Sequence, residues 1–244
     1  MADFLTFTAG TGLLVVVLIV FARASASVFL EQEDTLDASN TEQEQPGPPS
    51  LSTATLLANV ALTQGLFGLG IIVLAWYTSI PPVAFGLADG LSVVAATALG
   101  TAIGLVFFGL NDLATRFGQQ RGMASSEALR AALAPESRLG WVVLLLVVLP
   151  IIAGFEELLF RGALIGVTAA GFGLSPWLLA VVSSLAFALG HEAQGRLGVL
   201  ITGLLGFALA AVFILTGSLL VVIVAHYVIN ACEFIVHEGL DTAR

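Results

Sequence analysis

Long stretches without a charged residue dominate this sequence and limit what it can fold into. Residues 4–22, 51–80, 91–110 and 163–191 contain no aspartate, glutamate, lysine or arginine. About 20 apolar residues in a helix cross the hydrocarbon core of a bilayer. Inside lipid a chain must satisfy its own backbone hydrogen bonds, so such segments span as helices. The sequence therefore predicts an all-α, polytopic transmembrane helical bundle with about seven spans, within a range of six to eight.

The composition agrees with a membrane protein and excludes a nucleic-acid-binding one. Hydrophobic residues make up 58% of the 244 residues and charged residues only 10%. The chain has eight basic and seventeen acidic residues, which gives a net charge of -9. Nucleic-acid binding requires a basic surface. We expect membrane lipid as the surroundings, no nucleic-acid partner, and a location in the cell membrane of a prokaryote.

The pattern of apolar and polar residues divides the chain into three segments. Residues 1–30 form an N-terminal transmembrane helix rather than a signal peptide, because its start carries Asp3 and no basic residue. Residues 31–50 contain six acids, no base and three prolines, which predicts a disordered acidic linker. Residues 51–244 form the membrane-embedded bundle, whose motif-bearing core covers residues 141–236.

The spans are predicted at residues 4–22, 51–80, 91–110, 141–167, 177–192, 197–216 and 219–236. Four of the eight arginines lie in the polar segment 111–140, which the positive-inside rule places in the cytoplasm. Arg23 places the end of the first span on the same side. Ser125 and Ser126 predict the cap of a surface helix over residues 127–133, and Pro150 predicts a kink in the fourth span.

The segment Gly154–Gly162 places three ionisable residues at membrane depth, where each is costly and suggests a function. On an α-helix Glu157 and Arg161 share a face, whereas Glu156 points about 100° away from Glu157. The arginine can therefore neutralise Glu157 and leave Glu156 free for chemistry.

Two later spans also carry polar residues at similar depth. His191 ends the fifth span, and His226 and Asn230 lie inside the seventh. A helical rise of about 1.5 Å per residue brings Glu156 and His191 to within about 8 Å in depth. A carboxylate beside an imidazole can deprotonate a water, and a histidine with an asparagine amide can donate hydrogen bonds to an oxyanion. The pattern predicts amide hydrolysis with Glu156 as the base, in a polar cavity open to one side.

Other interpretations of the same residues remain open. Glu157 and Arg161 can be a buried structural ion pair, His191 an interfacial residue, and His226 with Asn230 a pair of interhelical hydrogen-bonding groups. A catalytically inactive immunity or scaffold protein can also retain the site. A proton-coupled transporter is a further alternative, but it would favour paired, pseudo-symmetric halves, which the sequence does not show.

The three motifs together resemble those of the CPBP family of intramembrane proteases, which includes CAAX prenyl endopeptidases and bacteriocin-processing Abi proteins. They read Glu156-Glu157-x-x-x-Arg161, Phe187-x-x-x-His191 and His226-x-x-x-Asn230. The resemblance covers about residues 141–232 and implies an all-helical membrane endopeptidase. It implies that Glu156 and His191 activate water and that His226 and Asn230 form the oxyanion hole. It also implies a protein or peptide substrate, which CAAX processing would require in lipidated form.

The resemblance leaves the use of a metal open, because the family has been described both as glutamate-type and as metal-dependent. A zinc ion would be held by Glu156, His191 and His226. The zinc-protease spacing His-Glu-x-x-His is absent. We favour a mechanism without a cofactor and keep zinc as the alternative, while the motifs predict the reaction type and not the cleavage site.

Overall fold

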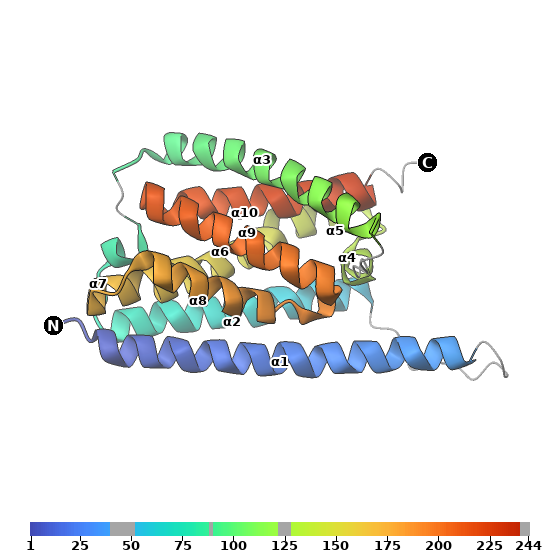
Figure 1. Ribbon diagram of the computed structural model, residues 1–244, viewed down its shortest axis with the longest axis horizontal. Coiled ribbons are helices and arrows are strands. Elements are labelled where there is room, and N and C mark those ends of the chain that lie inside the picture. The colour runs from blue at the N-terminus through green and yellow to red at the C-terminus, as the bar shows by residue number, and fades with distance from the viewer. Residues whose placement is uncertain (40–51, 88–89, 122–127, 240–244) are drawn as a thin grey trace.

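The computed structural model describes residues 1–39, 52–87, 90–121 and 128–239, which form a bundle of helices (Figure 1). Within these ranges the chain contains helices, turns and bends and no strand, which confirms the predicted all-α class. The remaining residues, including residues 40–50 of the predicted linker, lie outside the description.

The elements follow one another along the chain as helices of three kinds. The α-helices are α1 (Phe4–Ser39), α2 (Thr53–Tyr77), α3 (Val93–Gln119), α4 (Ala128–Leu133), α5 (Arg138–Val143), α6 (Leu149–Glu157), α7 (Thr168–Phe172), α8 (Pro176–Leu189), α9 (Gly195–Thr216) and α10 (Leu219–Phe234). The 3-10 helices are η1 (Pro82–Phe85) and η4 (Glu192–Gln194). The π-helical segments are η2 (Leu144–Val148), η3 (Leu158–Val167) and η5 (Ile235–Gly239).

Six described segments are long and apolar enough to cross a membrane, within the predicted range of six to eight. They are Phe4–Arg23, Thr53–Tyr77, Val93–Gln119, Arg138–Phe172, Glu192–Thr216 and Leu219–Gly239. The predicted fifth span corresponds to α8, whose 14 residues give a helix of about 21 Å, shorter than a hydrocarbon core of about 30 Å. The protein is therefore an integral membrane protein in which α8 is a short apolar helix among longer ones.

Two predicted boundaries differ from those in the structure. The first helix continues to Ser39, through residues that the sequence assigns to the linker. The third runs to Gln119, so that Arg116 lies on a helix rather than in the polar segment after it. The predicted surface helix is present as α4, and its proposed serine caps lie outside the described residues.

The connections between helices gather at two opposite ends of the bundle (Figure 1). The α7–α8 and α9–α10 turns lie at the end where the chain begins, whereas α4, α5 and the α8–α9 connection lie at the other end. The second end carries the arginine-rich segment. Arg23 contacts Glu192 in the α8–α9 connection and so lies toward the same end, whereas the cytoplasmic placement of this end stays a prediction.

The long segment from α5 to α7 is helical throughout, and two π-helical segments interrupt its α-helical winding. The π-helical η2 lies directly before Pro150, where the sequence predicts a kink. Proline has no N–H to donate, and its ring crowds the carbonyl four residues earlier, so a wider turn relieves the contact. A second π-helical segment, η3, begins directly after Glu157. Such segments often occur at functional sites.

Helix α3 supports α10 through glycines that allow close approach. A Cβ atom added at Gly104 would lie 2.7 Å from the carbonyl oxygen of Ala225 and 2.8 Å from the Cβ of Val228. One turn earlier, Gly100 meets α10 in the same way, with Val221 O at 2.6 Å. Small residues at a helix interface favour this packing in membranes.

Replacing Gly104 by alanine should therefore lower the free energy of unfolding by about 1–3 kcal/mol, because the added methyl group forces α3 and α10 apart. Gly109 on the same helix is the matched control, since no atom lies within 4 Å of a Cβ there. Gly109→Ala should be neutral or stabilising by up to about 1 kcal/mol. Denaturant unfolding in detergent micelles checks both variants, and equal stabilities would contradict this packing.

Candidate active site

An ion pair between Glu157 and Arg161 lies at the centre of the bundle. Arg161 Nη1 donates a hydrogen bond of 2.7 Å to Glu157 Oε1, and Nη2 donates one of 2.8 Å to the carbonyl oxygen of Gly206 on α9. Glu157 is 0% exposed and Arg161 1% exposed. The structure thus pairs Glu157 with Arg161, as their four-residue spacing predicts. Hydrogen bonds that involve charged groups are strong, and they offset part of the free-energy cost of removing these two charges from water.

Gly206 is a site residue that the sequence analysis did not identify. A Cβ atom at this position would lie 3.0 Å from the Phe187 ring and 3.6 Å from Arg161 Nη2. The absence of a side chain lets the guanidinium reach the backbone of α9. A single glycine in an apolar span carries no sequence signal that distinguishes this role from ordinary helix packing.

His226 on α10 lies between the two glutamates of the first motif. Its Nδ1 is 2.7 Å from Glu157 Oε1, and its Nε2 is 3.6 Å from Glu156 Oε2. The carboxylate of Glu157, paired with Arg161, accepts hydrogen bonds only, so Nδ1 carries the proton and donates. The longer Nε2–Oε2 separation is not a hydrogen bond. His226 is therefore oriented by Glu157 and presents its other nitrogen toward Glu156.

His191 lies just after the end of α8 and is held by its own helix. Its Nδ1 is 2.7 Å from the carbonyl oxygen of Phe187, to which it donates. In the neutral ring this leaves Nε2 as an acceptor. His191 is half-buried, in contrast to His226, which is 4% exposed.

The Phe187 ring connects the two histidines and the arginine. Its centroid lies 4.5 Å from that of His191 and 6.1 Å from that of His226. The Arg161 guanidinium carbon lies 4.9 Å from the same centroid, within reach of a cation–π interaction. The sequence analysis assigns Phe187 only to the motif of His191, whereas the ring contacts a residue of each motif.

Asn230 follows His226 by one turn of α10 and is half-buried. The structure thus unites four of the six predicted residues, Glu156, Glu157, Arg161 and His226, through direct contacts. It joins His191 to them through Phe187 and places Asn230 on the same helix as His226.

A metal ion does not fit these residues as they are arranged. Among the described residues, no group of three or more histidine, cysteine, aspartate or glutamate side chains lies close enough to hold an ion. Nδ1 of His226 donates to Glu157, which leaves Nε2 as the nitrogen that could bind a metal, so this hydrogen bond does not itself oppose binding. Zinc binding by Glu156, His191 and His226 would require these side chains to move.

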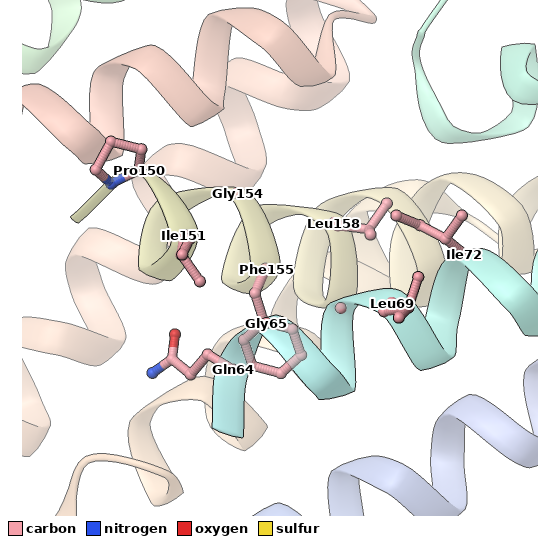
Figure 2. A pocket seen from close by; sticks show the side chains of 10 residues that line it. Gln64, Gly65, Leu69, Ile72, Pro150, Ile151, Gly154, Phe155 and Leu158 are labelled. Atoms are coloured by element: carbon pink, nitrogen blue, oxygen red, sulfur yellow. The ribbon is translucent and has the colours of Figure 1, made fainter. Parts of the chain in front are cut away.

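Two cavities among the described residues lie away from this cluster. One, of about 370 Å³, is a groove between α2 and α6, and Figure 2 shows Gln64, Ile151 and Phe155 on its walls. The second, of about 570 Å³, lies between α2 and η1 and shares Ile72 and Leu158 with the first. Neither is lined by a predicted catalytic residue.

The groove in Figure 2 opens on the face of α6 that points away from Glu156. Ile151, Gly154 and Leu158 line it, and at about 100° per residue they lie on the opposite side of the helix from Glu156, with Glu157 to one side. Neither cavity is thus the polar cavity that the sequence predicts beside the cluster. Glu156 is only 8% exposed, and a water-filled cavity at its carboxylate stays a prediction.

Comparison with known proteins identifies a family for the second half of the chain. Residues 138–232 match the family model described as type II CAAX prenyl endopeptidase Rce1-like. No curated protein and no solved structure shows significant similarity to the chain. The matched range begins at α5 and ends within α10, and it includes every predicted site residue.

Proposed function

Residues 138–232 match the Rce1-like family model of type II CAAX prenyl endopeptidases, and from this similarity we propose that the protein hydrolyses a peptide bond within the membrane, using a water activated by Glu156 and His191. A protease of this family acts on a protein substrate in a membrane environment. The catalytic type, the role of each residue and the lipidation of the substrate are our proposals.

The observation that carries the proposal is the placement of His226 between two carboxylates. Glu157 accepts from Nδ1 at 2.7 Å, and Glu156 lies 3.6 Å from Nε2. If Glu157 and Arg161 formed only a structural ion pair, that role would not explain why His226 is also oriented toward Glu156. A buried site that holds a base beside an oriented imidazole is suited to proton transfer.

In the proposed reaction Glu156 accepts one proton of the attacking water, and Nε2 of His191 accepts a hydrogen bond from its other proton. The hydroxide oxygen forms a bond to the carbonyl carbon of the scissile peptide, whose oxygen becomes an oxyanion. Glu156 then gives its proton to the leaving amine as the carbon–nitrogen bond breaks. The glutamate therefore ends the cycle ionised, as it began.

His226 and the amide of Asn230 would stabilise the oxyanion. Since Nδ1 of His226 donates to Glu157, its Nε2 can donate only when the ring carries both protons. Arg161 in turn holds the carboxylate of Glu157 in place through a hydrogen bond of 2.7 Å, so the supporting pair acts on the reaction through His226.

The direct test is peptide cleavage by the purified protein in liposomes. The wild type should cleave a fluorogenic peptide ending in a CAAX-type sequence, and a farnesylated peptide should be cleaved faster than the unmodified one. His191→Ala should lower the cleavage rate by about 10²-fold, the lower range for loss of a group that assists proton transfer. No cleavage of any peptide by the wild type would contradict the proposed function.

His237→Ala is the matched control for that experiment. His237 lies in η5, with Nε2 3.4 Å from Asp112 and 3.5 Å from Glu233, and its described contacts do not include a predicted site residue. We expect its cleavage rate to equal that of the wild type. A chelator added to the wild type separates the two catalytic types, because unchanged activity supports the metal-free mechanism and lost activity supports zinc.

A further inference from the structure

The first transmembrane helix, which lies outside the family match, is bound to the turn that carries His191. Arg23 near the middle of α1 holds the carboxylate of Glu192 with two of its nitrogens. Nε lies 3.1 Å from each carboxylate oxygen, and Nη2 lies 2.9 Å from Oε1. An arginine that binds a carboxylate through two nitrogens fixes the relative orientation of the two groups as well as their separation. Glu192 is the residue directly after His191.

The turn that carries His191 is short and is also held by local hydrogen bonds. It runs from Gly190, which ends α8, through η4 to Gly195, whose φ of 73° is the left-handed backbone that favours glycine. Its backbone bonds include His191 N to Ala188 O and Gln194 N to His191 O, each at 3.0 Å, and Gly195 N to Glu192 O. Two side-chain bonds add to these, from His191 Nδ1 to Phe187 O at 2.7 Å and from Thr202 Oγ1 to Gln194 Oε1 at 2.8 Å. An ion pair at position 192 therefore acts on the residue next to His191.

The opposite end of α1 is fixed to the bundle independently. The backbone N–H of Asp3 donates to Thr78 O at 2.8 Å, and Phe7 is fully buried with its ring edge-to-face on Phe85 at 5.6 Å. Close packing of Phe4 on Gly171 adds a third contact. In Figure 1 α1 lies along one edge of the bundle, beside α2 and α8.

We propose that α1 acts as a strut and that Arg23 and Glu192 are positioning residues, which hold the His191 turn in register with Glu156 and His226. The α1 strut gives the N-terminal span a role in catalysis that the family match, which begins at residue 138, does not include. The kinetic part of the inference rests on the proposed protease function.

The kinetic test compares kcat and KM of Arg23 variants in the liposome assay. Arg23 is exposed at 57% of its side chain and Glu192 at 31%, so the pair is a partly exposed one of limited strength. We expect Arg23→Ala to lower kcat by about three- to fivefold with little change in KM. Arg23→Lys should recover only part of the loss because it lacks the fork. The exchanged pair Arg23→Glu with Glu192→Arg should recover more than either single change.

Arg116→Ala is the matched control, because it removes an arginine of similar exposure, 64%, from a pair with Asp112 on α3. It should leave kcat unchanged. Equal losses in the Arg23 and Arg116 variants, or wild-type kcat in Arg23→Ala, would overturn the inference.

A second measurement does not depend on cleavage. The chain has three histidines, so ¹⁵N-histidine labelling in micelles gives three imidazoles to follow by NMR. Arg23→Ala should shift and broaden the His191 resonances and leave those of His237 in place. The exchanged pair should return the His191 resonances to their wild-type positions. A wild type that cleaves nothing would defeat the proposed function alone, whereas unchanged His191 resonances would defeat the α1 strut.

Discussion

Replacing Glu156 by glutamine is expected to lower the rate of peptide cleavage by about 10²–10⁴-fold, the usual cost of removing a general base. Glutamine has nearly the same shape but cannot accept a proton from water. The change should cost little stability, because Glu156 Oε2 stands 3.6 Å from His226 Nε2 and makes no direct hydrogen bond there. The expected signature is a large loss of kcat with a nearly unchanged KM and unfolding temperature.

Single-turnover kinetics of Glu156→Gln in liposomes, together with thermal unfolding of the same sample, would measure both quantities. Glu156→Asp is the informative companion, because it keeps the base but withdraws it by one methylene group and should retain part of the rate. If the glutamine variant cleaves at the wild-type rate, Glu156 is not the base.

The second large effect concerns stability. Arg161→Met should lower the free energy of unfolding by about 3–5 kcal/mol, since it leaves the buried carboxylate of Glu157 without its counter-ion. The side chains of this pair are 1% and 0% exposed, and the arginine also donates to the carbonyl of Gly206. His226 Nδ1 still donates to Glu157 in this variant, and that single hydrogen bond does not replace the lost guanidinium.

A double variant separates the unpaired charge from the loss of packing. Glu157→Gln together with Arg161→Met removes both charges while the amide oxygen can still accept from His226 Nδ1. It should be more stable than Arg161→Met alone, and the excess over additivity measures the coupling of the pair. Denaturant unfolding of the four proteins in one detergent gives the cycle. Strict additivity of the two single changes would contradict a buried, coupled pair.

The fold was largely predictable because the membrane imposes a length and a backbone rule on every span. Both rules are readable from uncharged runs such as residues 51–80 and 91–110. They do not report helix winding, so the π-helical η2 and η3 were not predicted beyond the irregularity expected at Pro150. Hydropathy also did not show that α8 would end after 14 residues.

The site was predictable in part. The spacing of Glu157 and Arg161 gives their contact because both lie on one helix. The depth estimate brought His226 to the level of the glutamates. Depth alone does not give the rotation of α10 about its axis, and this rotation decides that His226 donates to Glu157 rather than to Glu156. The contact of Gly206 with Arg161 depends on a third helix and has no signal in sequence spacing. The catalytic roles of all six residues remain predictions.

The glycine-lined contact between α3 and α10 also bears on what a minimal form of the protein can be. Family similarity begins at residue 138, yet α10 rests on Gly100 and Gly104, and α6 packs on α2. A polypeptide limited to residues 138–232 would present those faces to lipid, including the backbone carbonyls that the glycines cover. The boundaries of the family match thus describe similarity of sequence, whereas the packing of α6 and α10 depends on helices that precede it.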